Sequence, residues 1–259
     1  MIDGHIHIEH QPYTLELIDK MVEVALEKGI DELYILDHTH KFKEFDKMYL
    51  ECVTEELTWQ NYQKKRLDQI SIDEYVGFVN EVRKHSYPVK LHFGLEVCYF
   101  HGQMDFLKSV LDSLLPFKFD FLIGSVHHVD GAMVDYKEEV VRKFDIDVYY
   151  RHYYELVDEM IKTRMFTFIG HPDLIKIFNI FPSFDLTPIY HKIADSLQVY
   201  GQETENNSGL IRRGYPYPGL STELIKIFKE HHVKFHKSSD AHVYTDIGRV
   251  FDELEENYE

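Results

Sequence analysis

Apolar positions along the chain follow two alternating patterns. Short segments rich in β-branched and aromatic residues are typical of buried strands, and they are separated by stretches in which apolar positions recur with a helical period. The segments that predict strands are 1–8, 32–38, 90–100, 120–128, 166–173, 198–207 and 233–242. The stretches that predict helices are 14–28, 72–85, 104–115, 148–164, 188–197 and 222–231.

Strands that alternate with helices predict a parallel sheet, because parallel strands need crossover connections. Seven strand–helix units in 259 residues predict a distorted (β/α)7 barrel, one unit short of the common eightfold barrel. No low-complexity tract or change in composition divides the chain, so residues 1–259 are predicted to form a single domain. Residues 41–69 are polar and aromatic, and we expect them to form an insertion over the mouth of the barrel.

Side chains that commonly bind metals gather where six of the seven predicted strands end. In α/β barrels the loops at these ends carry the chemistry, so the side chains should meet at one rim. In HIH and DAH the two polar residues are two positions apart, which places them on one face of an extended strand. The residues at the strand ends are His5, His7, Asp37, His38, Glu96, His127, His128, His171, Asp173, Asp240 and His242.

Each of these residues also has an ordinary structural interpretation. An isolated HxH can simply line a polar barrel mouth, and Glu96 in an apolar strand can belong to a buried ion pair. His127 and His128 point to opposite faces if the strand continues, so only one of them should be a ligand. Asp37 and Asp173 can orient a ligand or cap a helix with similar ease. The combination on successive strands favours a site of imidazole and carboxylate, which suits Zn, Fe or Mn.

Charge and cysteine content narrow the function. The formal charge is −17, which disfavours non-specific binding to nucleic acid or to an anionic membrane. The two cysteines form no CxxC motif, and no apolar run predicts a membrane span or a signal peptide, so we expect a cytoplasmic protein. An anionic substrate would need local positive charge, which bound metal ions would supply. Arg212 and Arg213 follow the sixth predicted strand and could bind a phosphate, and Asn206 is a further candidate for a substrate contact.

Several motifs together resemble the polymerase and histidinol phosphatase (PHP) superfamily. They are HIH at 5–7, DH at 37–38, GLE at 94–96, SVHH at 125–128, GHPD at 170–173 and SDAH at 239–242, and they span nearly the whole chain. GSVHH, HPDLIKIF and NNSGLIRR are most similar to the histidinol-phosphate phosphatase branch. The resemblance implies a distorted (β/α)7 barrel that binds two or three divalent metals through nine residues.

The resemblance also implies how those ligands are shared. The first metal is expected at His5, His7, Glu96 and Asp240, and Glu96 would bridge to a second metal completed by His127 and His171. The third is expected at His10, His38 and His242. Many members hold the third-site histidine in a CPHG-like context, whereas this chain has HIEHQPYTLE, and the usual TDH or TEH is LDH here. His10 matches by its distance from the following helix rather than by its neighbours.

The reaction implied is hydrolysis of a small-molecule phosphate monoester. By resemblance, the substrate is L-histidinol phosphate and the products are L-histidinol and phosphate, as in histidine biosynthesis. Asp240 or His242 would transfer protons during the reaction, and Arg212, Arg213 and Asn206 would bind the substrate. Other possibilities are a phosphodiesterase or exonuclease of the same superfamily, a protein-tyrosine phosphatase, a metal-dependent amidohydrolase and a non-catalytic metal-binding module. The missing basic track disfavours the nuclease, and the missing lysine at a strand end disfavours the amidohydrolase.

Overall fold

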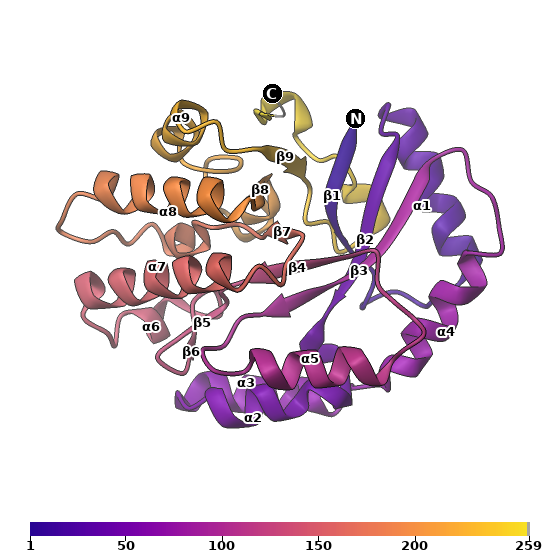
Figure 1. The fold of residues 1–259 in the computed structure, drawn as a ribbon, viewed down its shortest axis with the longest axis horizontal. Helices are drawn as coiled ribbons and strands as arrows, with labels where there is room; N and C mark the ends of the chain where they lie inside the picture. The colour runs from indigo at the N-terminus through magenta and orange to yellow at the C-terminus, as the bar shows by residue number, and fades with distance from the viewer. Residues whose placement is uncertain (258–259) are drawn as a thin grey trace.

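A computed structural model describes residues 1–257, and it consists of a parallel sheet wrapped by helices (Figure 1). Seven strands pair in the order β1-β2-β3-β4-β7-β8-β9, and every pair is parallel. The sheet returns to its first strand, because His7 N donates to Ala241 O at 2.7 Å and Ile6 forms a parallel bridge with Ala241. The strands are β1 (Ile2–His7), β2 (Glu32–His38), β3 (Lys90–Cys98), β4 (Phe121–Ser125), β7 (Phe168–Ile169), β8 (Glu203–Asn207) and β9 (Phe235–Ser238).

Helices cover the outside of this sheet and supply the crossovers between its strands. In α1 the apolar period buries Leu17, Ile18 and Met21, and Thr14 caps the helix by accepting a hydrogen bond from Leu17 N. The α-helices are α1 (Leu15–Glu27), α2 (Asp46–Cys52), α3 (Glu56–Arg66), α4 (Ile72–Val82), α5 (Met104–Ser113), α6 (Glu138–Val141), α7 (Ile146–Thr163), α8 (Thr187–Tyr200) and α9 (Thr222–Glu230). The predicted (β/α)7 barrel is therefore confirmed.

Two predicted strands have different bounds in the structure. Residues 198–200 belong to α8, which ends where Gly201 adopts a left-handed conformation (φ 63°), so β8 begins only at Glu203. The segment 120–128 is also interrupted, because β4 ends at Ser125. The chain then forms a small antiparallel hairpin of β5 (His128–Val129) and β6 (Ala132–Met133). A helical period and a strand pattern are difficult to separate over so few residues.

The barrel interior is filled on the side away from the strand ends that carry the site. Leu36, Phe121, Ile123 and Phe168 form a buried cluster between strands. Gly4 is required in β1 because a Cβ atom there would lie 2.1 Å from the ring of His236. This packed layer leaves only the carboxyl ends of the strands open for chemistry.

Residues 41–69 form short helices beside the carboxyl ends of the strands. The segment contains α2 and α3, and two 3-10 turns, Thr39–Lys41 and Lys43–Phe45, precede them. It is joined to the β5–β6 hairpin, since Thr54 N and Glu55 N both donate to Gly131 O at 3.1 and 3.0 Å. Within residues 1–257, no helix combines the length and apolar character that crossing a bilayer requires.

Candidate metal centre

Glu96 lies at the centre of a ring of imidazoles. Its side chain is 1% exposed, and each of its oxygens faces more than one histidine. The nearest nitrogens are Nε2 of His38 at 2.9 Å and Nε2 of His171 at 3.0 Å. Three further Nε2 atoms lie at 3.4 Å (His5), 3.4 Å (His7) and 3.5 Å (His127).

The sheet brings these side chains together from distant parts of the sequence. β1 supplies His5 and His7, and the β2–β3 register places His38 directly opposite Glu96. Asp240, after β9, has Oδ1 at 3.4 Å from His7 Nε2 and 3.5 Å from His242 Nδ1. The eight predicted ligands that lie in this cluster are His5, His7, His38, Glu96, His127, His171, Asp240 and His242.

The backbone is strained at two of these positions. His171 and Asp240 have positive φ angles of 21° and 50°, a region that non-glycine residues rarely adopt. Such strain concentrates at functional sites, where the surrounding structure holds it in place. Here it turns two ligand-type side chains back toward the barrel axis from the loops that follow β7 and β9.

Burial and mutual charge set the protonation states in the cluster. Burial raises the pKa of Glu96, but His38, His127 and His5 outweigh it and hold that pKa well below its usual range. Burial lowers the pKa of His7 well below its ordinary value, and its neighbours His38 and His242 lower it further. The carboxylate of Glu96 and the neutral imidazole of His7 are the forms that bind metal ions. Burial lowers the pKa of His38, but Glu9 and Glu96 outweigh it and raise that pKa to about 10.

The cluster fits divalent cations. Three groups each bring ligand atoms within 4.8 Å of one another: His7–Glu9–His38–His242, His5–His7–Glu96 and His38–Glu96–His127. His5 Nε2 and His7 Nε2 are 2.9 Å apart, near the separation of two ligands on one ion with bonds of about 2.0–2.1 Å. Nδ1 of His7 and Nδ1 of His171 are buried without a hydrogen-bond partner in the described residues. A cation bound between the Nε2 atoms of His5 and His7 would relieve the cost of holding their lone pairs so close together.

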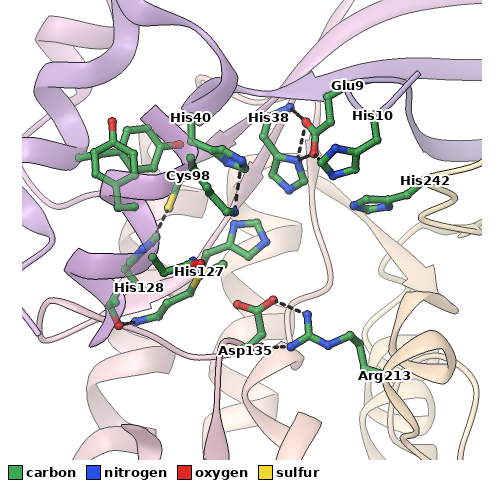
Figure 2. A pocket seen from close by; sticks show the side chains of 16 residues that line it. Glu9, His10, His38, His40, Cys98, His127, His128, Asp135, Arg213 and His242 are labelled. Atoms are coloured by element: carbon green, nitrogen blue, oxygen red, sulfur yellow. Dashed lines mark hydrogen bonds and ion pairs between the residues drawn. The ribbon is translucent and has the colours of Figure 1, made fainter. Parts of the chain in front are cut away.

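Glu9, which the sequence analysis did not single out, contacts His38. Glu9 is buried, and both its oxygens lie near His38 Nδ1, at 2.8 and 2.9 Å (Figure 2). The side chain of His10 is 68% exposed, its Nε2 lies 3.6 Å from Glu9 Oε1, and its ring centroid lies 5.9 Å from that of His242. His10 therefore lies outside the ring around Glu96 but lines the same cavity as His38 and His242, its expected partners at the third site. Glu9 follows His5 and His7 at every second position, so the three residues share one face of an extended strand. This spacing is the sequence signal that could have identified Glu9.

Glu205 is a second residue that the sequence analysis missed. It is fully buried on β8, and both its oxygens lie 3.1 Å from His5 Nδ1. Its Oε1 also accepts hydrogen bonds from His171 N at 2.9 Å and Asn207 Nδ2 at 2.8 Å. Nδ1 of His5 donates to this carboxylate, so in the neutral ring it is Nε2 that carries the lone pair and faces the cluster. The sequence signal that could have identified Glu205 is its position in the one predicted strand for which no ligand was found.

The residues with ambiguous roles have structural partners. His128 turns away from Glu96, and its Nδ1 lies 3.2 Å from Cys98 Sγ. Asp37 accepts hydrogen bonds from the Tyr13 hydroxyl and from Ile8 N. Of the paired histidines, His127 is the one in the cluster.

Asp173 is also engaged within the protein. Its Oδ2 accepts hydrogen bonds from Lys176 Nζ at 2.5 Å and from Ser221 N at 3.0 Å. It holds the loop after β7 in place without entering the ring of ligands.

The three predicted substrate-binding residues have different positions. Arg212 Nη2 lies 3.3 Å from Asp240 Oδ1. Arg213 pairs with the carboxylate and backbone carbonyl of Asp135 across the cavity (Figure 2). Asn206 requires a correction, because it is buried away from the cavity. Its amide donates to Glu255 O and accepts from Leu220 N, so it supports the loop after β8 instead of contacting a substrate.

Comparison with known proteins identifies a family that matches most of the chain. The family model for the PHP domain matches residues 3–209. A protein of Deinococcus radiodurans named "Probable histidinol-phosphatase" is 26% identical over 259 residues, covering 97% of this chain and 90% of the relative. A protein of Schizosaccharomyces pombe with the same name is 24% identical over 248 residues, covering 87% and 74%.

Solved structures share the fold. The HisK protein of Listeria monocytogenes superposes with a TM-score of 0.76 at 21% identity, covering 97% of this chain and 99% of that one. Histidinol phosphate phosphatase (HisK) of Lactococcus lactis, complexed with zinc, L-histidinol and phosphate, gives a TM-score of 0.63 at 19% identity, covering 94% and 86%. At these identities the two structures support the barrel alone.

Proposed function

This chain belongs to the PHP domain family, and on that premise we propose that it is a metal-dependent phosphatase that converts L-histidinol phosphate to L-histidinol and phosphate. The observation that carries the proposal is the carboxylate of Glu96 enclosed by five imidazole nitrogens at 2.9–3.5 Å, at the end of the barrel where chemistry occurs. The relatives named for histidinol phosphatase activity support the choice of substrate. A histidine biosynthetic role follows from that substrate.

The residues suggest how two or three ions would be held. The first would take His5, His7, Glu96 and Asp240, and the second would take Glu96, His127 and His171. His38 and His242 would hold the third, with His10 beside His242 as its expected partner. When bound, such ions (Zn, Fe or Mn) supply positive charge for phosphoryl oxygens and an activated water.

The surrounding side chains would orient these ligands before any substrate arrives. Glu205 fixes the ring of His5 through Nδ1, and Glu9 does the same for His38. In each case the second ring nitrogen, Nε2, is left to face Glu96. Orientation of this kind typically changes metal affinity or activity by about 10–100-fold.

We assign Asp240 as the residue that accepts a proton during the reaction. Burial raises the pKa of Asp240, but hydrogen bonding to His7 and the charge of nearby groups outweigh it and hold the pKa well below its usual range. Its carboxylate is therefore ionised and can accept a proton at Oδ1. Nδ1 of His242 lies 3.1 Å from the carbonyl oxygen of Asp240 and must donate to it. This leaves Nε2 of His242 with a lone pair, which suits a ligand better than a proton donor.

The two arginines would bind the phosphate. Arg212 and Arg213 line the same cavity as Glu96, His171 and Asp240. Guanidinium groups donate paired hydrogen bonds to phosphate oxygens. Arg212 is also next to Asp240, so it would place a phosphoryl group against the ligands.

The test is phosphate release from L-histidinol phosphate, an aryl phosphate and an aryl phosphodiester, with metal content measured on the same sample. Selective turnover of L-histidinol phosphate with two to three ions per chain is expected, and Glu96→Gln should abolish it. Faster turnover of the diester would indicate a phosphodiesterase instead. Bound metal without hydrolysis of any ester would contradict the phosphatase proposal and favour a metal-binding module.

A further inference from the structure

The cavity over the metal centre extends into a side lobe of about 150 Å³ that residues 39–66 help to form. The lobe is continuous with the metal centre, because His38, His127 and His242 line both. Its outer wall comes from α2, α3 and the β5–β6 hairpin. Figure 2 shows the junction, with His38 and His40 on one wall and the Asp135–Arg213 pair on the opposite one. A substrate with its phosphate on the metals could extend its alcohol part into this lobe.

One wall of the lobe is made of stacked aromatic rings. Tyr49 and Tyr62 stack with their ring centroids 4.9 Å apart and an angle of 19° between the planes. Their hydroxyl groups bond within the protein, to Thr39 at 2.8 Å and to Asp46 at 2.5 Å. The tyrosines therefore offer apolar ring surface to a ligand. Flat groups pack well against such a surface.

Two polar groups in the lobe have unused hydrogen-bonding capacity. Lys65 Nζ lies 3.2 Å from His40 Nε2, a bond that occupies one of the three ammonium donors. Among residues 1–257, no carboxylate lies within 4.0 Å of this ammonium. Asn61 also lines the lobe, and its Nδ2 has only a weak contact with Met133 Sδ at 3.9 Å. Its amide oxygen accepts no hydrogen bond within the same residues.

We propose that this lobe binds an uncharged, planar nitrogen heterocycle in the alcohol part of the substrate, and that Lys65 determines specificity for it. A neutral imidazole has one acceptor nitrogen and one N–H donor. Lys65 offers donors only, and the amide oxygen of Asn61 offers an acceptor, so the pair complements both ring nitrogens. A cationic group in the same position would be repelled by Lys65. The inference rests on the proposed function, which places the phosphate of L-histidinol phosphate on the metals.

The test compares Lys65→Met with Lys64→Met, an exposed neighbour on α3 that serves as the matched control. KM and kcat are measured for L-histidinol phosphate and for phosphoethanolamine, which keeps the amine and phosphate but lacks the ring. Lys65→Met should raise KM for L-histidinol phosphate by about 10-fold or more, the usual effect of losing a hydrogen bond to a charged group. It should leave kcat and the values for phosphoethanolamine within about threefold. Lys65→Arg keeps the hydrogen-bond donors, so its KM for L-histidinol phosphate should be close to that of the wild type.

Calorimetry with L-histidinol separates this proposal from the proposed function. Wild-type protein should bind L-histidinol more tightly than alaninol, and Lys65→Met should remove that preference. Failure to hydrolyse L-histidinol phosphate would contradict the proposed function, while a preference that depends on Lys65 would still support the lobe. An equal rise in KM for both esters would place Lys65 on the phosphate and overturn the proposal. No change in KM or in L-histidinol binding would overturn it as well.

Discussion

Replacing Glu205 tests whether a residue outside the ring of ligands controls the metal centre. The carboxylate has no exposed surface and makes four close contacts. Both oxygens lie 3.1 Å from His5 Nδ1, and Oε1 also accepts from His171 N and Asn207 Nδ2. Burial raises the pKa of Glu205, but His5 outweighs it and lowers the pKa to about 2, so the group is ionised near neutral pH.

Glu205→Gln should weaken metal binding while leaving the fold intact. The amide oxygen can still accept from His171 N and Asn207, but the amide nitrogen then faces His5 Nδ1. The one remaining oxygen must then serve His171 N, Asn207 Nδ2 and His5 Nδ1 together. The NH2 group beside Nδ1 only donates, so it favours the His5 tautomer that carries its proton at Nε2, where the metal would bind. Loss of such an orienting carboxylate costs about 10–100-fold in affinity or activity. This corresponds to about 1.4–2.7 kcal/mol.

Glu205→Ala should add a loss of stability. It leaves two buried donors, His171 N and Asn207 Nδ2, without an acceptor, and each costs about 1–3 kcal/mol. The metal-stripped variant should therefore unfold at lower urea concentration than either wild type or Glu205→Gln. The difference in unfolding free energy between the two variants reports the loss of an acceptor for these donors, separately from any change in the tautomer of His5.

The assay is metal affinity by competition with a chelator, together with kcat/KM for L-histidinol phosphate and urea unfolding of the metal-stripped proteins. Glu203→Gln is the matched control, because Glu203 is on the same strand and only partly buried. Wild-type metal affinity and activity in Glu205→Gln would refute the reasoning about His5. Equal stability of the alanine and glutamine variants would refute the account of the two donors.

Three further predictions follow from single side chains. Glu9→Gln should lower the metal content per chain more than His10→Ala does, because Glu9 is buried against His38 whereas His10 is mostly exposed; elemental analysis would show the difference. Asn206→Ala should destabilise the protein by about 1–3 kcal/mol in urea unfolding without changing KM, because its amide satisfies buried backbone groups only. Burial raises the pKa of Glu55, but a hydrogen bond from Lys143 and others at the start of α3 lower it from 4.5 to about 2. The stability that Glu55 contributes is thus present above pH 4.5 and lost as pH falls toward 2, so wild type and Glu55→Gln should converge there in urea unfolding.

Long periodic segments and the order of elements were predictable from the sequence. The helix 14–28 and its counterparts were found within a few residues, because burial of one face imposes the apolar period directly. The bounds of β8 were not, because residues 198–200 satisfy a strand pattern and a helix pattern equally well. What decided between them was packing of α8, which is a tertiary effect.

Site residues were predictable where strand geometry alone determines their position. His5 and His7 share one face at the end of their strand, and Glu96 and His38 reach the same site from the ends of β3 and β2. His10 was placed by distance along the chain, and in the structure it is mostly exposed beside His242, while Glu9 points inward to His38. Glu205 was missed because a glutamate that orients a ligand looks the same in sequence as one on the surface. Only the fold shows that its neighbour is His5.

The net negative charge of the chain is compatible with an anionic substrate, because the buried glutamates of the site are already paired with imidazoles. Glu96 faces imidazoles on both oxygens, Glu205 is bound by His5, and Glu9 is bound by His38. A phosphate entering the cavity therefore meets ring nitrogens, any metal ions they hold, and two arginines. The formal charge of −17 describes the whole surface, whereas the field at the site is set by groups within a few ångströms. For each of these three buried carboxylates the imidazole partner offsets the desolvation that the charge would otherwise cost.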